Sequence, residues 1–158
     1  MFVAVLIMLV STILLFFYLR AVCQKLLRRQ FTREFYKVIV SDNFLEFPLI
    51  RKGVEDFGSP GEYRRLRMTL RCDFVIVTYL LKKASNLNQR FFPDDRLMML
   101  YFEMLFVSLV TQHWLRLPEN STVLKLTAVL EYLANVVGQR INTVSFGNLT
   151  AANYLPDF

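Results

Sequence analysis

The side chains of this sequence that could carry out chemistry are few. The chain of 158 residues contains one histidine and two cysteines. His113 and Glu103 lie in the same strongly apolar segment, where a carboxyl group is a familiar candidate for acid–base work or a proton relay. No Ser/His/Asp or Cys/His set can be assembled around them. We therefore predict that the chain is not an enzyme, and a small enzyme or proton-relay subunit is the least favoured of three hypotheses.

Metal, cofactor and phosphate sites are not predicted either. Cys23 and Cys72 lack the CxxC spacing of zinc sites and redox pairs, so we interpret them as two free thiols. A lone helical histidine such as His113 is more often a capping or surface residue than a metal or pigment ligand. The glycines between residues 53 and 61 are too irregularly spaced for a phosphate loop, and no Gly-Lys-Ser/Thr follows them. We expect no cofactor and no bound metal.

The charge balance points to an anionic neighbour. There are 19 Lys and Arg against 13 Asp and Glu, a net charge of +6. Part of this excess lies on the first turns of a predicted helix over residues 60–85, at Arg64, Arg67 and Arg71. Close to a membrane anchor, such a basic face is better explained by lipid head groups or an acidic protein than by nucleic acid. We expect no nucleic-acid partner.

The first 19 residues contain no charged side chain, and 17 of them are apolar. As a helix this run is about 28 Å long, close to the roughly 30 Å thickness of the hydrocarbon core. A cleaved signal peptide is the competing interpretation, but no basic segment precedes the apolar core and Arg20 occupies the expected cleavage region. We predict an uncleaved transmembrane anchor over residues 1–22.

Basic side chains follow this span and none precedes it. By the positive-inside rule, Met1 is therefore expected outside and the rest of this single-pass membrane protein in the cytoplasm. We assign six side chains to the membrane interface, where they would contact anionic lipid head groups. They are Tyr18, Arg20, Lys25, Arg28, Arg29 and Arg33.

After the span, residues 23–58 are predicted as a basic juxtamembrane helix, continuing to about Lys37, and then an irregular packed connector interrupted at Pro48. Ser59-Pro60-Gly61-Glu62 is a capping box that starts the helix over 60–85.

Two further helices follow. Pro93 and the two acids after it start the next one, and Asn120-Ser121 starts the last, which we expect to fray or end near Gly138.

These elements predict an all-α fold, with one N-terminal transmembrane helix followed by a small three-helix up-down bundle over residues 59–141. Residues 97–110 are apolar at 12 of 14 positions, on every side of the helix, so we place this helix centrally between the other two. A second membrane span there is the alternative. We disfavour it because Glu103 would lie mid-span, and we expect Glu103 to find a partner in the core, either Asp73 or one of the arginines of helix 60–85.

Residues 142–158 contain a single charged side chain, Asp157, and several aromatic ones. We predict that this segment is an apolar docking tail. The side chains assigned to partner docking are those of the basic face and three aromatic residues of the tail. They are Arg64, Arg67, Arg71, Phe146, Tyr154 and Phe158.

The leading hypothesis is a non-catalytic, single-span accessory or assembly subunit that stabilises a larger membrane complex. Its partners would be other membrane-protein subunits, and an energy-transducing complex is suggested by analogy only. The alternative is a free-standing, membrane-tethered adaptor that recruits an acidic soluble partner through the basic face of helix 60–85.

Overall fold

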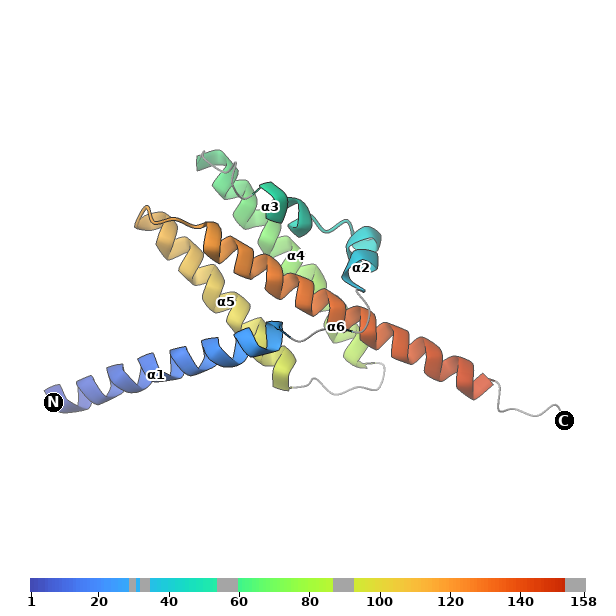
Figure 1. The fold of residues 1–158 in the computed structure, drawn as a ribbon, viewed down its shortest axis with the longest axis horizontal. Coiled ribbons are helices and arrows are strands. Elements are labelled where there is room, and N and C mark those ends of the chain that lie inside the picture. Colours follow the sequence, from blue (N-terminus) through green and yellow to red (C-terminus); the bar gives the residue numbers. More distant parts are fainter. Residues whose placement is uncertain (29–30, 32–34, 54–59, 87–92, 153–158) are drawn as a thin grey trace.

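The computed structural model describes residues 1–28, 31, 35–53, 60–86 and 93–152. Within these ranges all regular structure is helical, which confirms the predicted fold class (Figure 1). Six helices are described: α1 (Phe2–Leu27), α2 (Tyr36–Asn43), α3 (Phe47–Gly53), α4 (Pro60–Asn86), α5 (Pro93–Trp114) and α6 (Asn120–Ala152).

The starts of the three long helices after α1 agree with their sequence signals. Proline is the first residue of both α4 and α5, where its missing N–H has no partner to lose. α4 ends at Asn86, within one residue of the predicted end. The N-cap expected at Ser59 lies outside the described residues.

The helix at the centre of the fold is α6, whereas the sequence led us to place α5 there. α2, α3, α4 and α5 all pack against α6 (Figure 1). The side chains of Leu126, Leu130, Leu133 and Val137 are fully buried along it. A separate three-helix bundle is therefore not confirmed, because the connector helices α2 and α3 share the same core with the long helices.

One side of α5 faces outward, although the helix is apolar all round. Its outer row, which we define as Leu100, Glu103, Val107, Thr111 and Trp114, is exposed. The predicted core position of Glu103 is therefore wrong, as is its pairing with Asp73. Glu103 lies between the exposed Leu100 and Val107 at helical spacing, so its carboxylate reaches solvent and needs no buried partner.

The segment between α1 and α4 differs from the prediction in two ways: α1 is shorter than expected, and the connector expected to be irregular contains the helices α2 and α3. α1 ends at Leu27, so the expected continuation to about Lys37 is wrong. Contacts with α6 explain why the chain turns away: the ring of Phe31 packs edge-on against Tyr132 at 5.5 Å, and the Tyr36 N–H donates to Asn135 Oδ1 at 2.9 Å. These contacts place the short helix α2 along α6.

α6 does not end near Gly138, as we had expected, but continues to Ala152. A Cβ atom at position 138 would lie only 2.3 Å from the Cβ of Phe35. The glycine therefore allows the chain before α2 to approach α6 closely, and the many contacts of α6 outweigh the helix propensity lost at one glycine.

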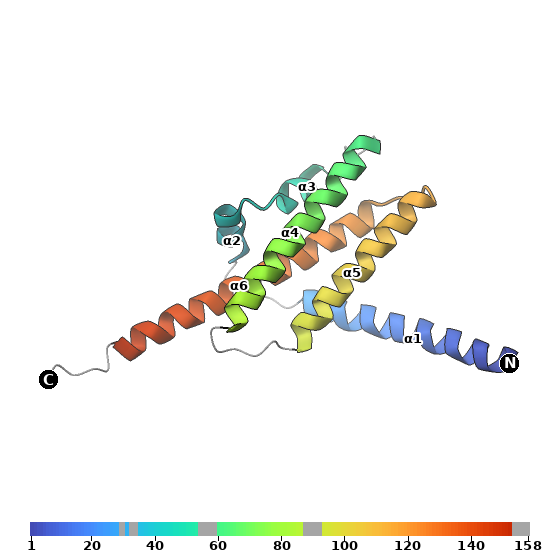
Figure 2. The ribbon, with the colours of Figure 1, turned by 180° about the vertical axis from the view of Figure 1, so that it is seen from behind.

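α1 is attached to the body only by its C-terminal end. Cys23 is fully buried against the core, and Leu26 and Leu27 pack beside it. Every residue from Met1 to Tyr18 is exposed, and the helix projects from the body as an arm (Figures 1 and 2). By length and composition, α1 is the one helix in the described part of the chain able to cross a membrane.

Candidate functional site

The predicted membrane-interface residues that the structure describes lie at the base of this arm. Tyr18, Arg20 and Lys25 are exposed on α1, and Arg28, also exposed, is its C-cap residue. We call Arg20, Lys25 and Arg28 the basic collar. Arg29 and Arg33 lie outside the described residues. The collar follows directly after about 27 Å of uncharged helix, which is where phosphate groups lie when such a helix spans a bilayer.

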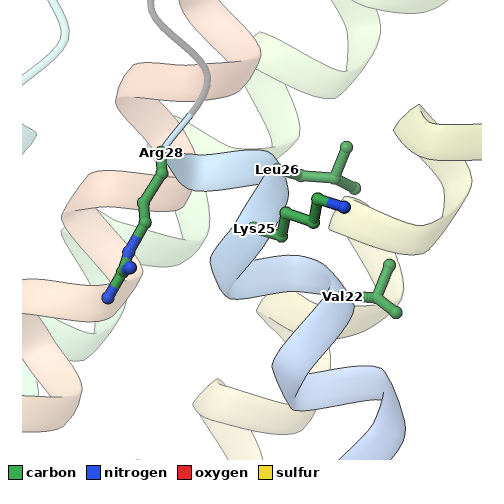
Figure 3. Close-up of a pocket in the computed structure, with 4 residues that line it drawn as sticks. All are labelled: Val22, Lys25, Leu26 and Arg28. Atoms are coloured by element: carbon green, nitrogen blue, oxygen red, sulfur yellow. The ribbon is translucent and has the colours of Figure 1, made fainter.

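An open pocket of about 470 Å³ lies at the collar. Val22, Lys25, Leu26 and Arg28 line it. Val22, Lys25 and Leu26 lie on one side of α1, whereas the Arg28 side chain extends the other way, past α6 (Figure 3). An aliphatic wall with an ammonium group beside it suits the boundary between lipid chains and head groups.

The basic face of α4 is exposed, as a surface for partners requires. Arg64, Arg67 and Arg71 are all exposed. The Arg71 guanidinium lies over the ring of Phe106 of α5, 5.6 Å from its centroid. This cation–π contact holds one arginine in place while its outer edge stays accessible.

Sequence reasoning missed a row of exposed apolar side chains that continues this surface along α4. Met68 is 62% exposed, Val75 59% and Tyr79 63%. We call the three arginines and these three side chains the docking face. The available signal was a second apolar series at spacings of seven and four residues, beside the series that forms the core.

The aromatic residues assigned to docking in the tail are not placed by the structure. Phe146 falls on the helical backbone of α6, but its side chain is outside the described residues, as are Tyr154 and Phe158. Their role stays a prediction.

The contacts of His113 lie at one corner of the body. Its Nδ1 lies 2.8 Å from Glu119 Oε1, and its ring stacks on Tyr63 with 3.5 Å between centroids. Burial, and then the negative charge of Glu119, raise the pKa of the Tyr63 hydroxyl. The cluster joins the end of α5 to the start of α6 and to α4, so His113 has a structural role.

Glu103 does not join His113 in a site. It lies on the outer row of α5, whereas the partner of His113 is Glu119. Across the described ranges, no three His, Cys, Asp or Glu side chains are grouped so that they could share a metal ion. Among the sites predicted from the sequence, the described part of the chain leaves the collar and the docking face as candidates.

Sequence reasoning did not identify the partners of two buried carboxyl groups. Asp95 at the start of α5 forms a buried ion pair with Arg140 of α6. Asp73 of α4 accepts hydrogen bonds through Oδ2 from the N–H groups of Glu46 and Phe47, at 3.0 and 2.7 Å, and so caps α3. Burial raises the pKa of Asp73 to about 6, although these two N–H donors oppose the shift. Both carboxyl groups connect helices.

No protein-family model, no curated protein and no solved structure matches this chain. The functional argument therefore depends on its own geometry.

Proposed function

We propose that this protein is a non-catalytic, single-span accessory or assembly subunit of a larger membrane complex. The observation that carries the proposal is the apolar arm: the side chains from Met1 to Tyr18 are exposed, while Cys23 at its base is fully buried in the body. Moving one large apolar side chain out of water is worth about 1.5–3 kcal/mol. A rigidly attached row of such side chains therefore favours a bilayer around the arm.

The basic collar supports one orientation. Arg20, Lys25 and Arg28 all follow the apolar stretch, so Met1 lies outside and the helical body lies in the cytoplasm. The pocket beside Lys25 would then lie at the level of the lipid head groups, where anionic lipids add about 1 kcal/mol of attraction per basic side chain.

Cysteine labelling tests this orientation, because Cys72 is exposed and Cys23 is buried. A membrane-impermeant maleimide should label Cys72 only after the cells are opened. The matched control is Phe2→Cys in a Cys72→Ser background, which should be labelled in intact cells. The reverse pattern would show that the orientation is wrong.

Protein partners are supported by the docking face. Met68, Val75 and Tyr79 are exposed on α4. A subunit buries such side chains against a neighbour, and charged residues around an apolar patch are typical of protein interfaces.

The test of the subunit proposal is native-gel migration and mass spectrometry of the chain extracted from its own membranes in mild detergent. It should migrate with a large assembly in fixed stoichiometry. Val75→Glu should release it, whereas Leu49→Glu should not, since Leu49 is exposed to a similar degree (68%) on α3. Migration as one chain in a micelle would exclude the subunit function.

The exposed arginines of the docking face favour a second candidate, a free-standing tethered adaptor for an acidic soluble protein. Its binding should weaken steeply with ionic strength, because exposed charges are screened over about 10 Å at 0.1 M salt. Arg64→Glu should abolish recruitment, and Lys52→Glu on α3 is the matched control. If the binding of the partner does not change with ionic strength, an electrostatic adaptor is excluded.

A further inference from the structure

The turn between α5 and α6 presents large apolar side chains to solvent at one end of the body. Trp114 is 87% exposed, Leu115 64% and Leu117 50%, and Arg116 between the two leucines is exposed as well. Trp114 is the one tryptophan of the chain. We call residues 114–117 the α5–α6 turn.

This turn is held in place by hydrogen bonds. The N–H of Leu115 donates to the carbonyl of Thr111 at 3.0 Å, and the N–H of Leu117 to that of Gln112 at 2.9 Å. Arg116 adopts a φ of 53°, in the left-handed region that non-glycine residues adopt only at a conformational cost. The fold therefore holds three large apolar side chains outward at some conformational cost.

Side-chain contacts between α5, α6 and α4 hold the turn in place. The Thr122 hydroxyl donates to Gln112 Oε1 at 2.7 Å, and His113 is bound by Glu119 and Tyr63. These contacts clamp the end of α5 to the start of α6. The exposed side chains consequently move with the whole body.

The position of the turn relative to the arm indicates what covers it. The α5–α6 turn and the free end of α1 lie toward the same side of the molecule, and the described end of α6 lies toward the opposite side (Figures 1 and 2). This end of the body therefore extends from the base of α1 back toward the side of its free end. A bilayer around α1 lies on the side toward which the turn projects.

The composition of the turn matches that surface. Tryptophan concentrates at membrane–water interfaces, where its ring contacts lipid chains and its N–H stays hydrated. Leu115 and Leu117 add aliphatic surface. Arg116 is the charge that complements anionic phosphates, and its long side chain can extend to them from below the head groups.

We infer that the α5–α6 turn is a second membrane contact, which inserts Trp114, Leu115 and Leu117 into the interfacial layer of the bilayer that α1 crosses. The inference rests on the proposed membrane anchoring by α1. It goes further in one respect, because a second contact fixes the tilt of the body relative to the membrane, which α1 alone leaves free.

The single tryptophan makes this contact directly measurable. The full chain is reconstituted into vesicles of phosphatidylcholine and phosphatidylglycerol in equal amounts, and Trp114 fluorescence is recorded. We expect blue-shifted emission, quenching by lipids brominated near the head group and protection from aqueous acrylamide. Leu115→Ser with Leu117→Ser should shift the emission to the red.

The matched control places the reporter on another exposed site. Phe44, in the turn between α2 and α3, is 89% exposed and also has a positive φ, of 52°. The Phe44→Trp variant in a Trp114→Phe background should emit at long wavelength and be quenched by acrylamide in the same vesicles. Equal behaviour of the two reporters would overturn the inference.

Vesicle flotation separates this failure from failure of the proposed anchoring. If the chain floats with the vesicles after alkaline washing while Trp114 stays accessible to acrylamide, α1 is inserted and the second contact is wrong. If the chain does not float, both the anchoring and the second contact are wrong. Flotation together with lipid quenching of Trp114 supports both.

Discussion

α1 and α6 are both long helices with a large apolar surface, yet they have opposite surroundings. α1 has 26 residues and is exposed from its start to Tyr18, whereas α6 has 33 residues and is buried over most of Thr122–Arg140. The difference lies in their polar side chains. α6 contains buried Asn135 and Arg140, which bind groups on other elements. The hydroxyl of Thr12 in α1 instead donates to the Met8 carbonyl of its own helix, at 2.7 Å.

The comparison illustrates how a helix suited to lipid differs from a helix at the centre of a protein. A helix in lipid must satisfy its polar groups within itself, because lipid chains offer no partners. A helix at the centre of a protein can carry polar groups that bind its neighbours. Composition separates the two cases as well, because α1 alone among the described helices is apolar enough to cross a membrane, whereas α5 packs in the body and keeps one exposed row.

The largest expected difference is between two arginine substitutions, one in α6 and one at the end of α1. Arg140→Met should lower the free energy of unfolding by about 3–5 kcal/mol, because it removes the guanidinium that compensates the buried Asp95 carboxylate. Arg28→Met, at the exposed C-cap of α1, should leave the unfolding of the body unchanged. Urea unfolding in mild detergent, followed by circular dichroism, measures both. An equal effect of the two variants would contradict the assignment of Arg140 to the core.

A pair of leucine variants makes the same comparison with apolar side chains. Leu130→Ala in α6 should lower the free energy of unfolding by about 2–5 kcal/mol, since Leu130 is fully buried and its loss leaves a cavity. Leu9→Ala in α1, where Leu9 is 57% exposed, should not destabilise the body. Both changes replace leucine by alanine within a helix, so helix propensity is matched. If Leu9→Ala destabilised the body, the N-terminal part of α1 would have to pack against it, and the comparison would be wrong.

The pH dependence of stability provides a third test, because the body contains a buried carboxyl group whereas α1 contains no Asp or Glu. The folded state raises the pKa of Asp73 from 3.8 to about 6, so it binds the proton more tightly than the unfolded chain does. This contribution to stability is complete below pH 3.8 and is lost as the pH rises through about 6.

Asp73→Asn keeps an oxygen that can accept from Glu46 and Phe47 but cannot titrate. As the pH rises from below 3.8 to above about 6, the stability of this variant relative to the original chain should therefore increase by roughly 3 kcal/mol. Asp73→Ala lacks the acceptor and should be destabilised at both ends. Unfolding curves at several pH values measure the differences, and a pH-independent difference for the Asn variant would contradict the buried, titrating carboxyl group.

The smallest expected difference is between two substitutions that enlarge a side chain, one in α6 and one in α1. Gly138→Ala should cost about 1–3 kcal/mol, because the added Cβ would lie 2.3 Å from Phe35 and the chain before α2 would have to shift. Ala4→Leu in α1 enlarges an exposed side chain and should have no effect on the body. Thermal unfolding measures the pair. A stabilised Gly138→Ala protein would indicate that Phe35 does not pack at this position.

Local signals predicted the parts of this protein that depend on neighbouring residues in the chain. The prolines at positions 60 and 93 are the first residues of α4 and α5, and residues 2–18 of the uncharged N-terminal segment form the exposed arm of α1. The arginines assigned to docking are exposed as expected, although their role stays a prediction. Such features follow from backbone hydrogen bonding and hydropathy, which act over a few residues.

Contacts between distant residues could not be predicted in the same way. Asp95 was interpreted only as a helix-start acid, yet its partner Arg140 lies 45 positions away. Gly138 was read as a helix end, because nothing near it in the chain reveals the approach of Phe35. The core position of Glu103 was wrong for a related reason: twelve apolar neighbours do not say which side of the helix the other helices cover.

By itself, therefore, the sequence determined that this protein is helical, where its long helices start, and that its first helix is apolar enough to cross a membrane. Only the tertiary structure decided that α6 is the central helix, that the connector folds onto it, and that Trp114 is held outward on the side toward which α1 projects. The physical reason is that helix formation is a local balance, whereas burial depends on which apolar surfaces of distant segments cover one another.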